Sequence, residues 1–495
     1  MKAGEVLKGS LTVALGGLIS KIIGAVYRVP LTNLIGAEGI GLYQMVFPVY
    51  CAMLTFSSTG LPAAISKLVG ENPQGGGCVF RRSLLLFGSI GAAGSLIMFV
   101  LGGLFAKLQG NYSAAICYRA MSPAVFCVSV ISCVRGYFQG KGNMRPTAVS
   151  QITEQAVKTV FGLFFCFMFG KTPVTAAALA SAAVTVSEIF ALAYMFIKLK
   201  ISGYIKEKTP RERGSYKKIL ALTVPVSLTA LMLPLGHFAD SFIVINALGR
   251  TPEATALFGI YSGSVAALTG LPIALAYGAA VACVPAISRG EYREAVNAVR
   301  FTGLISIPFT LFFAFFAEEC IGIVYGGMQS AERFAAARIL GLDAVSVTLL
   351  SFLQTSNAVL MAEGKQKIPL YSLGGALLLR TALCALFCRM PEIGISGAVI
   401  AANLSYGAAL SVNAYFAFKG IFVLRMLSDV SKCFLCAIIC VLGGFFVYMA
   451  IGGTAAFIAA SALAAILYAA FTFLLGPLGD MAGKIFSGKK KSFSG

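Results

Sequence analysis

Residue types on which many soluble enzymes rely are scarce or missing in this chain of 495 residues. Tryptophan is absent, histidine occurs once, and charged residues make up only 12%, roughly half of the usual soluble share. A single histidine excludes most histidine-based catalysis. The sequence also lacks a phosphate-binding P-loop, an HExxH metal motif and a GxSxG nucleophile in a strand-turn-helix context. We therefore expect no enzyme activity and no bound cofactor.

Apolar residues dominate instead, at 58% hydrophobic with a mean hydropathy of +0.86. A helix that spans a bilayer needs about 20 predominantly apolar residues. The sequence therefore predicts an all-α polytopic membrane protein. Its fourteen expected transmembrane helices cover residues 9–29, 40–65, 84–106, 113–134, 147–170, 174–197, 219–245, 256–285, 301–317, 335–361, 368–388, 393–418, 430–451 and 454–476.

Basic residues far exceed acidic ones and give a net charge of +20. Most lysines and arginines fall in segments that face one side of the membrane if the N-terminus is cytoplasmic. The positive-inside rule then places both termini in the cytoplasm. The excess charge is expected to contact anionic lipid headgroups. Nucleic acid is not an expected partner, because no readable binding motif accompanies the charge.

Thirteen cysteines do not indicate a metal or redox site. They lie almost wholly inside apolar segments, where a free cysteine behaves as a small hydrophobic residue. Cys433, Cys436 and Cys440 share a helical face, but the run that joins them contains no histidine or acid. No metal site is expected.

The chain shows weak internal similarity between two halves. Its longest predicted cytoplasmic connection, residues 198–218, follows the sixth expected helix. Short motifs recur in the same order on either side of it: Gly41-Leu42-Tyr43 with Gly259-Ile260-Tyr261 at an offset of 218, Arg119 with Arg338, and QGKGNMRP with AEGKQKIP. Because six helices per half is an even number, the repeats are expected to run in parallel about an axis along the membrane normal.

Four regions follow from this division. Residues 1–200 are expected to form an N-terminal six-helix bundle, and residues 201–218 a basic cytoplasmic linker. Residues 219–418 would form a C-terminal six-helix bundle, and residues 419–495 two extra helices with a basic cytoplasmic tail. Prolines and glycines inside several spans fit either close helix packing or hinges for alternating access.

Charged residues inside apolar spans are costly and mark candidate functional sites. Lys21 and Arg28 are seven residues apart, so they share one face of the first helix. Asp240 occupies the corresponding position in the second half. It is a candidate to face Lys21 across a central cavity, or alternatively to form a buried ion pair without a transport role.

The full set of candidates comprises five basic and four acidic residues. The basic ones are candidate substrate ligands, and the acidic ones candidate cavity-lining or ion-coupling groups: Lys21, Arg28, Arg119, Arg338 and Arg380, with Asp240, Glu154, Glu188 and Asp343. Simpler explanations stay open. Arg28, Arg119 and Arg338 can reach the headgroups by snorkelling, and Glu154 and Lys158, four residues apart, can neutralise each other.

Several longer runs carry a family resemblance: YRVPLTNLIGAEGIGLYQMVFPVY, STGLPAAISK, RGYFQGKGNMRPTAVSQITEQ, DSFIV, GIYSG with VPAIS, and NAVLMAEGKQKIPL. They resemble the stage V sporulation protein B and polysaccharide biosynthesis branch of the multidrug/oligosaccharidyl-lipid/polysaccharide exporter superfamily. That branch is similar to the MurJ-type lipid II flippases. The resemblance implies a MATE-like V of two six-helix bundles, plus two helices that form a groove for a lipid tail.

The resemblance also implies a function. A flippase of this branch would move an undecaprenyl-pyrophosphate-linked cell-wall precursor, lipid II or a related lipid-linked oligosaccharide, across the bacterial cytoplasmic membrane by alternating access. It would serve peptidoglycan or spore-cortex synthesis, with cell-wall synthesis enzymes as partners. A diphosphate headgroup favours lysine and arginine ligands.

The match to that family's basic residues is partial. Lys21, in SKIIG, matches the basic position of the family's first helix, whereas Arg28 is shifted by one from the second such position, where Tyr27 falls. The family also implies arginines in the second and eighth helices, and neither predicted span contains lysine or arginine here.

Two other functions remain open. A cation-coupled multidrug antiporter of the same fold would rely on Asp240, Glu154 and Glu188. A non-transporting membrane scaffold for wall synthesis would not need Lys21 or Arg28.

Overall fold

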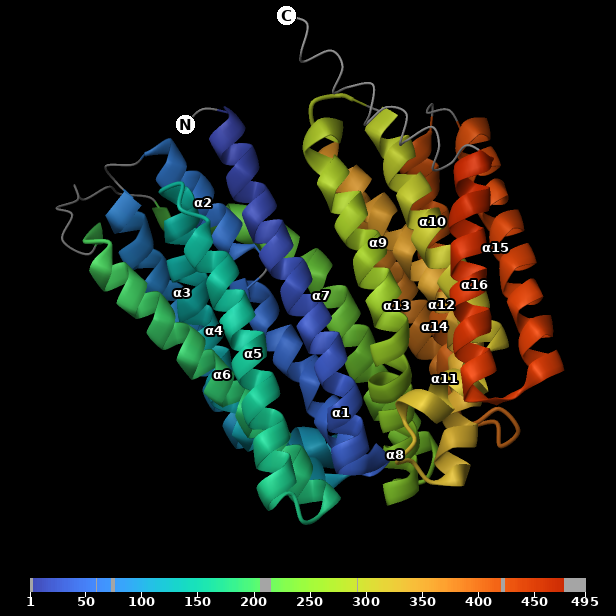
Figure 1. The fold of residues 1–495 in the computed structure, drawn as a ribbon. Helices are drawn as coiled ribbons and strands as arrows, with labels where there is room; N and C mark the ends of the chain where they lie inside the picture. The colour runs from blue at the N-terminus through green and yellow to red at the C-terminus, as the bar shows by residue number, and fades with distance from the viewer. Residues whose placement is uncertain are drawn as a thin grey trace, which may run out of the picture. The chain divides into compact units, whose positions relative to one another are not determined.

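The computed structural model describes residues 3–58, 60–72, 76–204, 215–291, 293–419 and 423–475. Regular structure in these residues is entirely helical, as predicted (Figure 1). The elements are α1 (Ala3–Ser58), α2 (Leu61–Glu71), α3 (Gly76–Leu108), η1 (Tyr112–Ala114), α4 (Ala115–Gly140), α5 (Arg145–Phe169), α6 (Pro173–Ile201), α7 (Ser215–Ala247), α8 (Pro252–Gly259), η3 (Ile260–Val265), α9 (Ala266–Ile287), α10 (Arg293–Phe315), α11 (Ala317–Val324), α12 (Ser330–Ala362), α13 (Lys367–Phe387), α14 (Ser396–Phe418), α15 (Val423–Ile451) and α16 (Gly453–Leu474).

Twelve helical segments among the described residues are long and apolar enough to cross a bilayer. The chain is therefore a multi-pass membrane protein, as predicted, although the count differs from fourteen. The first two predicted spans run together in α1, where Ile22–Thr55 counts as one segment. The helix α14 is not among the twelve, because polar residues such as Asn403 and Asn413 interrupt its apolar run.

The helix α1 contains 56 residues and bends at Gly36. The φ of 74° and ψ of 175° at this residue lie outside the helical region, and a positive φ is readily adopted only by glycine. The predicted spans 9–29 and 40–65 are thus separated by a break at a single residue within one long helix.

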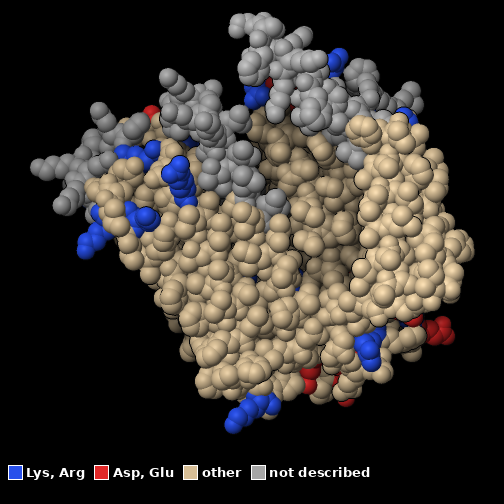
Figure 2. All heavy atoms as spheres, viewed as in Figure 1, with Lys and Arg blue, Asp and Glu red and all other residues tan. Residues whose placement is uncertain are grey.

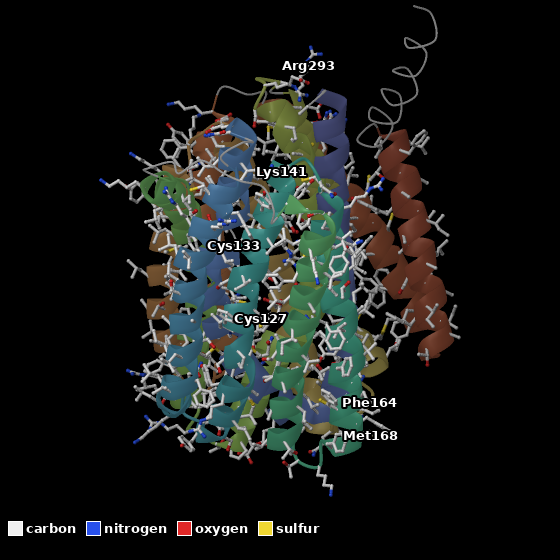
Figure 3. All side chains as sticks on the ribbon, turned by 90° about the vertical axis from the view of Figure 1, so that its left-hand side faces the viewer. Cys127, Cys133, Lys141, Phe164, Met168 and Arg293 are labelled. Atoms are coloured by element: carbon white, nitrogen blue, oxygen red, sulfur yellow. The ribbon has the colours of Figure 1, made fainter. Side chains whose placement is uncertain are left out.

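Charge at the molecular surface is unevenly distributed along the helices (Figure 2). On the face shown in Figure 2, charged side chains gather toward the helix ends, and the band between is almost uncharged. Lys141, directly after α4, marks one end in Figure 3, and the exposed Phe164 and Met168 of α5 lie toward the other. This distribution suits helices that meet lipid tails at their middle and water at their ends.

Packing divides the chain into two compact units, each discontinuous in sequence. The first comprises residues 1–267, 327–332 and 373–401, and the second comprises residues 268–326, 333–372 and 402–495. In the first unit α1 packs along α4, α5 and α6, and α3 packs along α4. A buried cluster that includes Phe87, Val134 and Met195 joins α3, α4 and α6.

The second unit contains a buried ion pair between α10 and α15. Arg300 donates from Nε to Asp429 at 2.5 Å, and both side chains are almost completely shielded from solvent. The Tyr468 hydroxyl of α16 donates to the backbone carbonyl of Leu304 at 3.1 Å. These contacts attach α15 and α16 to α10 by specific polar bonds as well as by apolar packing.

The backbones of α1 and α8 come into direct contact in the first unit. A Cβ atom added to Gly41 would lie 2.1 Å from the carbonyl oxygen of Thr255, and one added to Gly259 would lie 2.3 Å from the carbonyl oxygen of Ala37. One turn farther along α1, the Gln44 side chain donates to the carbonyl of Ser262. Only glycine permits this approach, because the obstructing atoms belong to the backbone and cannot rotate away.

This contact predicts that Gly41→Ala and Gly259→Ala each destabilise the protein. The added methyl group must push two helices apart, and overpacking of this kind costs about 1–3 kcal/mol. Gly88→Ala is the matched control, because a Cβ at this helical position meets nothing within 4 Å. Thermal unfolding in detergent would measure the effect, and equal melting temperatures for all three variants would contradict it.

Candidate functional site

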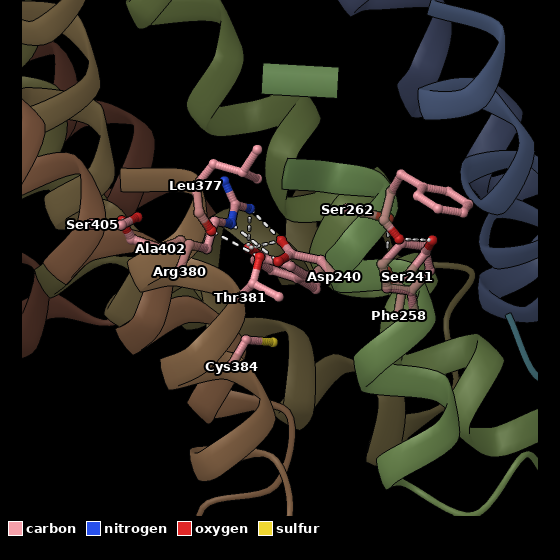
Figure 4. Close-up of polar contacts among 12 residues, drawn as sticks. Asp240, Ser241, Phe258, Ser262, Leu377, Arg380, Thr381, Cys384, Ala402 and Ser405 are labelled. Carbon is pink, nitrogen blue, oxygen red and sulfur yellow. Dashed lines mark hydrogen bonds and ion pairs between the residues drawn. The ribbon is translucent and has the colours of Figure 1, made fainter. Parts of the chain in front are cut away.

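A buried ion pair joins α7 to α13 within the first unit. Arg380 donates from Nε to Oδ1 of Asp240 at 3.1 Å and from Nη2 to Oδ2, so the pair is bidentate (Figure 4). The exposed fractions of the two side chains are 4% for Arg380 and 1% for Asp240. The carboxylate is thus fully engaged by a guanidinium in the geometry that these two groups prefer.

Tyr261 completes this arrangement from the π-helical turn η3. Its hydroxyl lies 3.2 Å from Nη2 of Arg380 and 3.4 Å from Oδ2 of Asp240. A π-helical turn displaces the side chains that follow it and is frequent at functional positions. Here it places Tyr261, from the repeated Gly-Ile-Tyr motif, against the ion pair.

Asp240 therefore pairs with Arg380, a partner not identified from the sequence. The ion pair is observed, and a role of Asp240 in transport stays a prediction. The side chain of Lys21, the partner suggested by the repeat, lies outside the described part of the chain.

A second polar cluster lies among α1, α4, α5 and α6 of the same unit. Arg135 of α4 donates from Nη2 to Oε2 of Glu154 at 3.3 Å and from Nε to the Ser150 hydroxyl at 2.9 Å. The Gln155 amide donates to the other carboxylate oxygen of Glu154 at 2.9 Å. Both oxygens of the Glu154 side chain therefore have a hydrogen-bond donor.

Lys158 forms no ion pair with an acid in the described part of the chain, although Glu154 and Glu188 attract it electrostatically. The expected neutralisation between Glu154 and Lys158 does not form as an ion pair among the described residues, because Arg135 reaches across from α4 to Glu154. The Lys158 ammonium lies over the ring of Tyr27, 5.8 Å from its centroid. Only the tertiary contact between α4 and α5 could reveal this exchange of partners.

Arg28 has a similar environment on α1. Its guanidinium lies 5.8 Å from the centroid of the Phe47 ring, and no carboxylate among the described residues forms an ion pair with it. The side chain is half-buried, which agrees less well with full snorkelling into water. Arg28 and Lys158 are close enough to repel each other electrostatically.

The two clusters of the first unit lie within electrostatic reach of one another. His237, one turn before Asp240 on α7, interacts with both Arg380 and Arg28. The first unit thus combines one closed ion pair with a region where basic charge exceeds acidic charge.

The remaining predicted residues lie elsewhere. Arg119 is exposed near the start of α4. In the second unit, the exposed Arg338 lines a cavity of about 590 Å³ together with Glu318 and Glu319 of α11. Asp343 accepts a hydrogen bond from Thr269 at 3.1 Å. Glu188, on α6, is buried beside Glu154 in the first unit.

No described set of three or more His, Cys, Asp or Glu side chains could hold a metal ion.

The ion pair between Asp240 and Arg380 predicts strongly coupled mutational effects. Asp240→Asn or Arg380→Gln alone leaves a buried charge without its partner and should lower stability by about 3–5 kcal/mol. The double variant removes both charges and should recover most of that loss. Thermal unfolding of the four proteins gives the coupling, and additive losses in the double variant would contradict a direct pair.

Comparison with known proteins agrees with the motif resemblance. The chain is 29% identical over 424 residues to stage V sporulation protein B of Bacillus subtilis, covering 80% of each chain. It is 26% identical over 444 residues to lipid II flippase MurJ of the same organism, covering 82% of this chain and 81% of the relative.

Solved structures share the fold. A lipid II flippase MurJ in an inward closed conformation is similar with a TM-score of 0.75 at 15% identity, covering 94% of this chain and 99% of the other. An inward-facing multidrug resistance MATE transporter is similar with a TM-score of 0.66 at 17% identity, covering 83% of this chain and 96% of the other.

The family described as polysaccharide biosynthesis protein matches residues 6–291, more than half of the sequence. The chain belongs to the polysaccharide biosynthesis protein family.

Proposed function

We propose that this protein is a transporter, not an enzyme, that moves a lipid-linked sugar precursor with a diphosphate headgroup across the bacterial cytoplasmic membrane by alternating access. Lipid II or a related undecaprenyl-linked oligosaccharide for peptidoglycan or spore-cortex synthesis is the expected cargo. Support comes from family membership, from relatives named as a flippase and a sporulation protein, and from the MurJ-like fold.

The observation that carries the proposal is that Arg28 and Lys158 form no ion pair among the described residues, although Glu154 and Glu188 attract Lys158 electrostatically. Both basic residues belong to segments apolar enough to cross the membrane, where a charge outside an ion pair is costly. A diphosphate diester carries two negative charges and several acceptor oxygens. It would compensate both cations through charge-assisted hydrogen bonds.

The surroundings of these cations also suit such a ligand. The Arg28 guanidinium lies over the Phe47 ring and the Lys158 ammonium over the Tyr27 ring. Such cation–π contacts orient the cations but do not neutralise them. The Tyr27 hydroxyl is buried and has no hydrogen-bond partner among the described residues. It is a donor that could meet a phosphate oxygen after a small movement of α1 relative to α5.

The contact between α1 and α8 supports a duplicated architecture. Gly41 meets Thr255 while Gly259 meets Ala37, and both pairs of equivalent positions are 218 residues apart. Reciprocal contacts of this kind are the mark of a two-fold relation between similar elements. We propose six-helix bundles at residues 1–200 and 219–418, joined by a basic linker and followed by two extra helices, with both termini cytoplasmic.

In the same proposal, separation of α1 from α8 accompanies passage of the cargo. At Gly41 and Gly259 the two backbones can part without separating interdigitated side chains, so that opening has to break few side-chain bonds, among them the one from Gln44 to Ser262. Anionic lipids would contact the basic cytoplasmic segments, and enzymes of wall synthesis would supply or consume the cargo.

A cation-coupled multidrug antiporter is supported less well. Such a transporter would need a carboxylate at Asp240 that is free to bind a cation, and Arg380 occupies both of its oxygens. An Asp240→Asn variant with unchanged drug accumulation in cells would agree with this. A non-transporting scaffold would tolerate loss of Arg28 and Lys158 without a change in wall synthesis.

The experiment is translocation of fluorescent lipid II and other undecaprenyl-diphosphate sugars in proteoliposomes. Arg28→Ala and Lys158→Ala should each slow transport by about tenfold or more, because a hydrogen bond to a charged group contributes about 1.5–3 kcal/mol. Lys158→Arg should retain most activity. Lys67→Ala is the control, since Lys67 forms only an exposed pair with Glu71 on α2.

Two results would overturn the proposal. One is that the wild-type protein moves none of these lipids. The other is that Arg28→Ala and Lys158→Ala transport as fast as Lys67→Ala.

A further inference from the structure

Glu188 is a buried acid that the proposed transport site does not use. It lies on α6 with only 3% of its surface exposed. Its Oε2 atom has no hydrogen-bond donor among the described residues. A negatively charged carboxylate without hydrogen-bond donors is costly to bury, because nothing replaces the water that would solvate its charge. A protonated carboxyl group is neutral and avoids most of this cost.

Glu154, on α5, is close enough to interact electrostatically with the Glu188 carboxyl group. The two acids differ in their partners. Glu154 receives donors on both oxygens, from Arg135 and Gln155. The Oε2 atom of Glu188 has no donor within the described residues, and two neighbouring buried carboxyl groups do not readily carry charge together. Of the two acids, Glu188 is therefore the one whose surroundings favour a bound proton.

The charged and titratable groups around Glu188 come from each neighbouring helix. Arg135 and Cys127 face it from α4, Glu154 and Lys158 from α5, and Tyr50 from α1. Two of these groups are basic, so a metal cation entering this region would be repelled by both. A proton meets less repulsion, because it is held covalently by one carboxyl oxygen and shared with the next.

We propose that Glu188 is a proton-binding site linked to binding of the anionic headgroup, so that the protein binds the diphosphate more tightly when Glu188 is protonated. The cluster contains three basic side chains, Arg28, Arg135 and Lys158, and the two acids Glu154 and Glu188. With Glu188 protonated it has two positive charges in excess, which matches the two negative charges of a diphosphate diester.

Loss of the proton adds a negative charge beside Lys158. Lys158 then gains an acidic neighbour that competes with the headgroup for its ammonium group. Binding of the headgroup and binding of the proton therefore favour each other, and linkage requires that the effect be reciprocal. The sign is unambiguous: affinity for the diphosphate falls as pH rises through the range in which Glu188 loses its proton.

This inference rests on the proposed function, since it takes the diphosphate at Arg28 and Lys158 as the ligand. The test measures affinity of the wild-type protein in nanodiscs for an undecaprenyl-diphosphate sugar between about pH 5 and 9. The diester headgroup has no ionisation of its own in this range. One linked proton changes the affinity by up to about tenfold per pH unit.

Glu188→Gln should bind the lipid with an affinity that does not change with pH, because glutamine is a neutral analogue of the protonated acid. Glu291→Gln is the control, since Glu291 forms only an exposed pair with Arg289 and should leave the wild-type pH profile intact. Thermal unfolding establishes that both variants are folded.

Infrared spectroscopy offers a readout that needs no lipid. The wild-type protein at the acidic end should show a protonated-carboxyl band that Glu188→Gln lacks and Glu291→Gln retains. A pH-independent affinity of the wild-type protein, or the same pH profile in Glu188→Gln, would overturn the proton linkage while leaving transport intact. A wild-type protein that binds no diphosphate lipid at any pH would instead overturn the proposed function.

Discussion

The packing of the helices depends on how each charged side chain in an apolar segment is neutralised by a neighbouring group. Without water, each ionised side chain needs a partner, and the chain meets this need in different ways. Asp240 with Arg380, and Arg300 with Asp429, are closed pairs in which the charges cancel at hydrogen-bonding distance. Arg28 and Lys158 are held over aromatic rings and form no ion pair among the described residues. The first kind of charge joins helices, and the second kind is the one that we propose binds the headgroup.

The closed pairs have a mechanical consequence. Each connects helices that are distant in sequence, α7 with α13 and α10 with α15. A buried pair is a weak net source of stability but a strong constraint on register, because a shift of one helix would separate the charges. The helices that it joins are therefore expected to move together. Relative motion is expected where α1 and α8 meet through the backbones of Gly41 and Gly259, because no ion pair among the described residues joins the two helices there.

The polar cluster of the first unit is organised by one ion pair between neighbouring helices. Arg135 of α4 engages Glu154 of α5. Glu154 thus takes its donors from Arg135 and Gln155 and not from Lys158, which follows it on the same helix. Glu188 is buried on α6, and its Oε2 atom has no donor among the described residues. In the transport that we propose, this arrangement leaves Arg28 and Lys158 for the anionic headgroup and Glu188 for a proton.

Sequence alone determined the membrane class, the helical fold and the family, because hydropathy and local motifs are properties of contiguous residues. It also identified Arg28, Asp240, Glu154 and Glu188 as unusual, since any charge in an apolar run is visible without a structure. It did not determine their partners. Glu154 has Lys158 one turn away, yet it pairs with Arg135, 19 residues earlier on another helix, and Asp240 pairs with Arg380 at a separation of 140 residues. Ion pairing depends on distances of a few ångströms between side chains, and only the packing of helices decides which charges come that close.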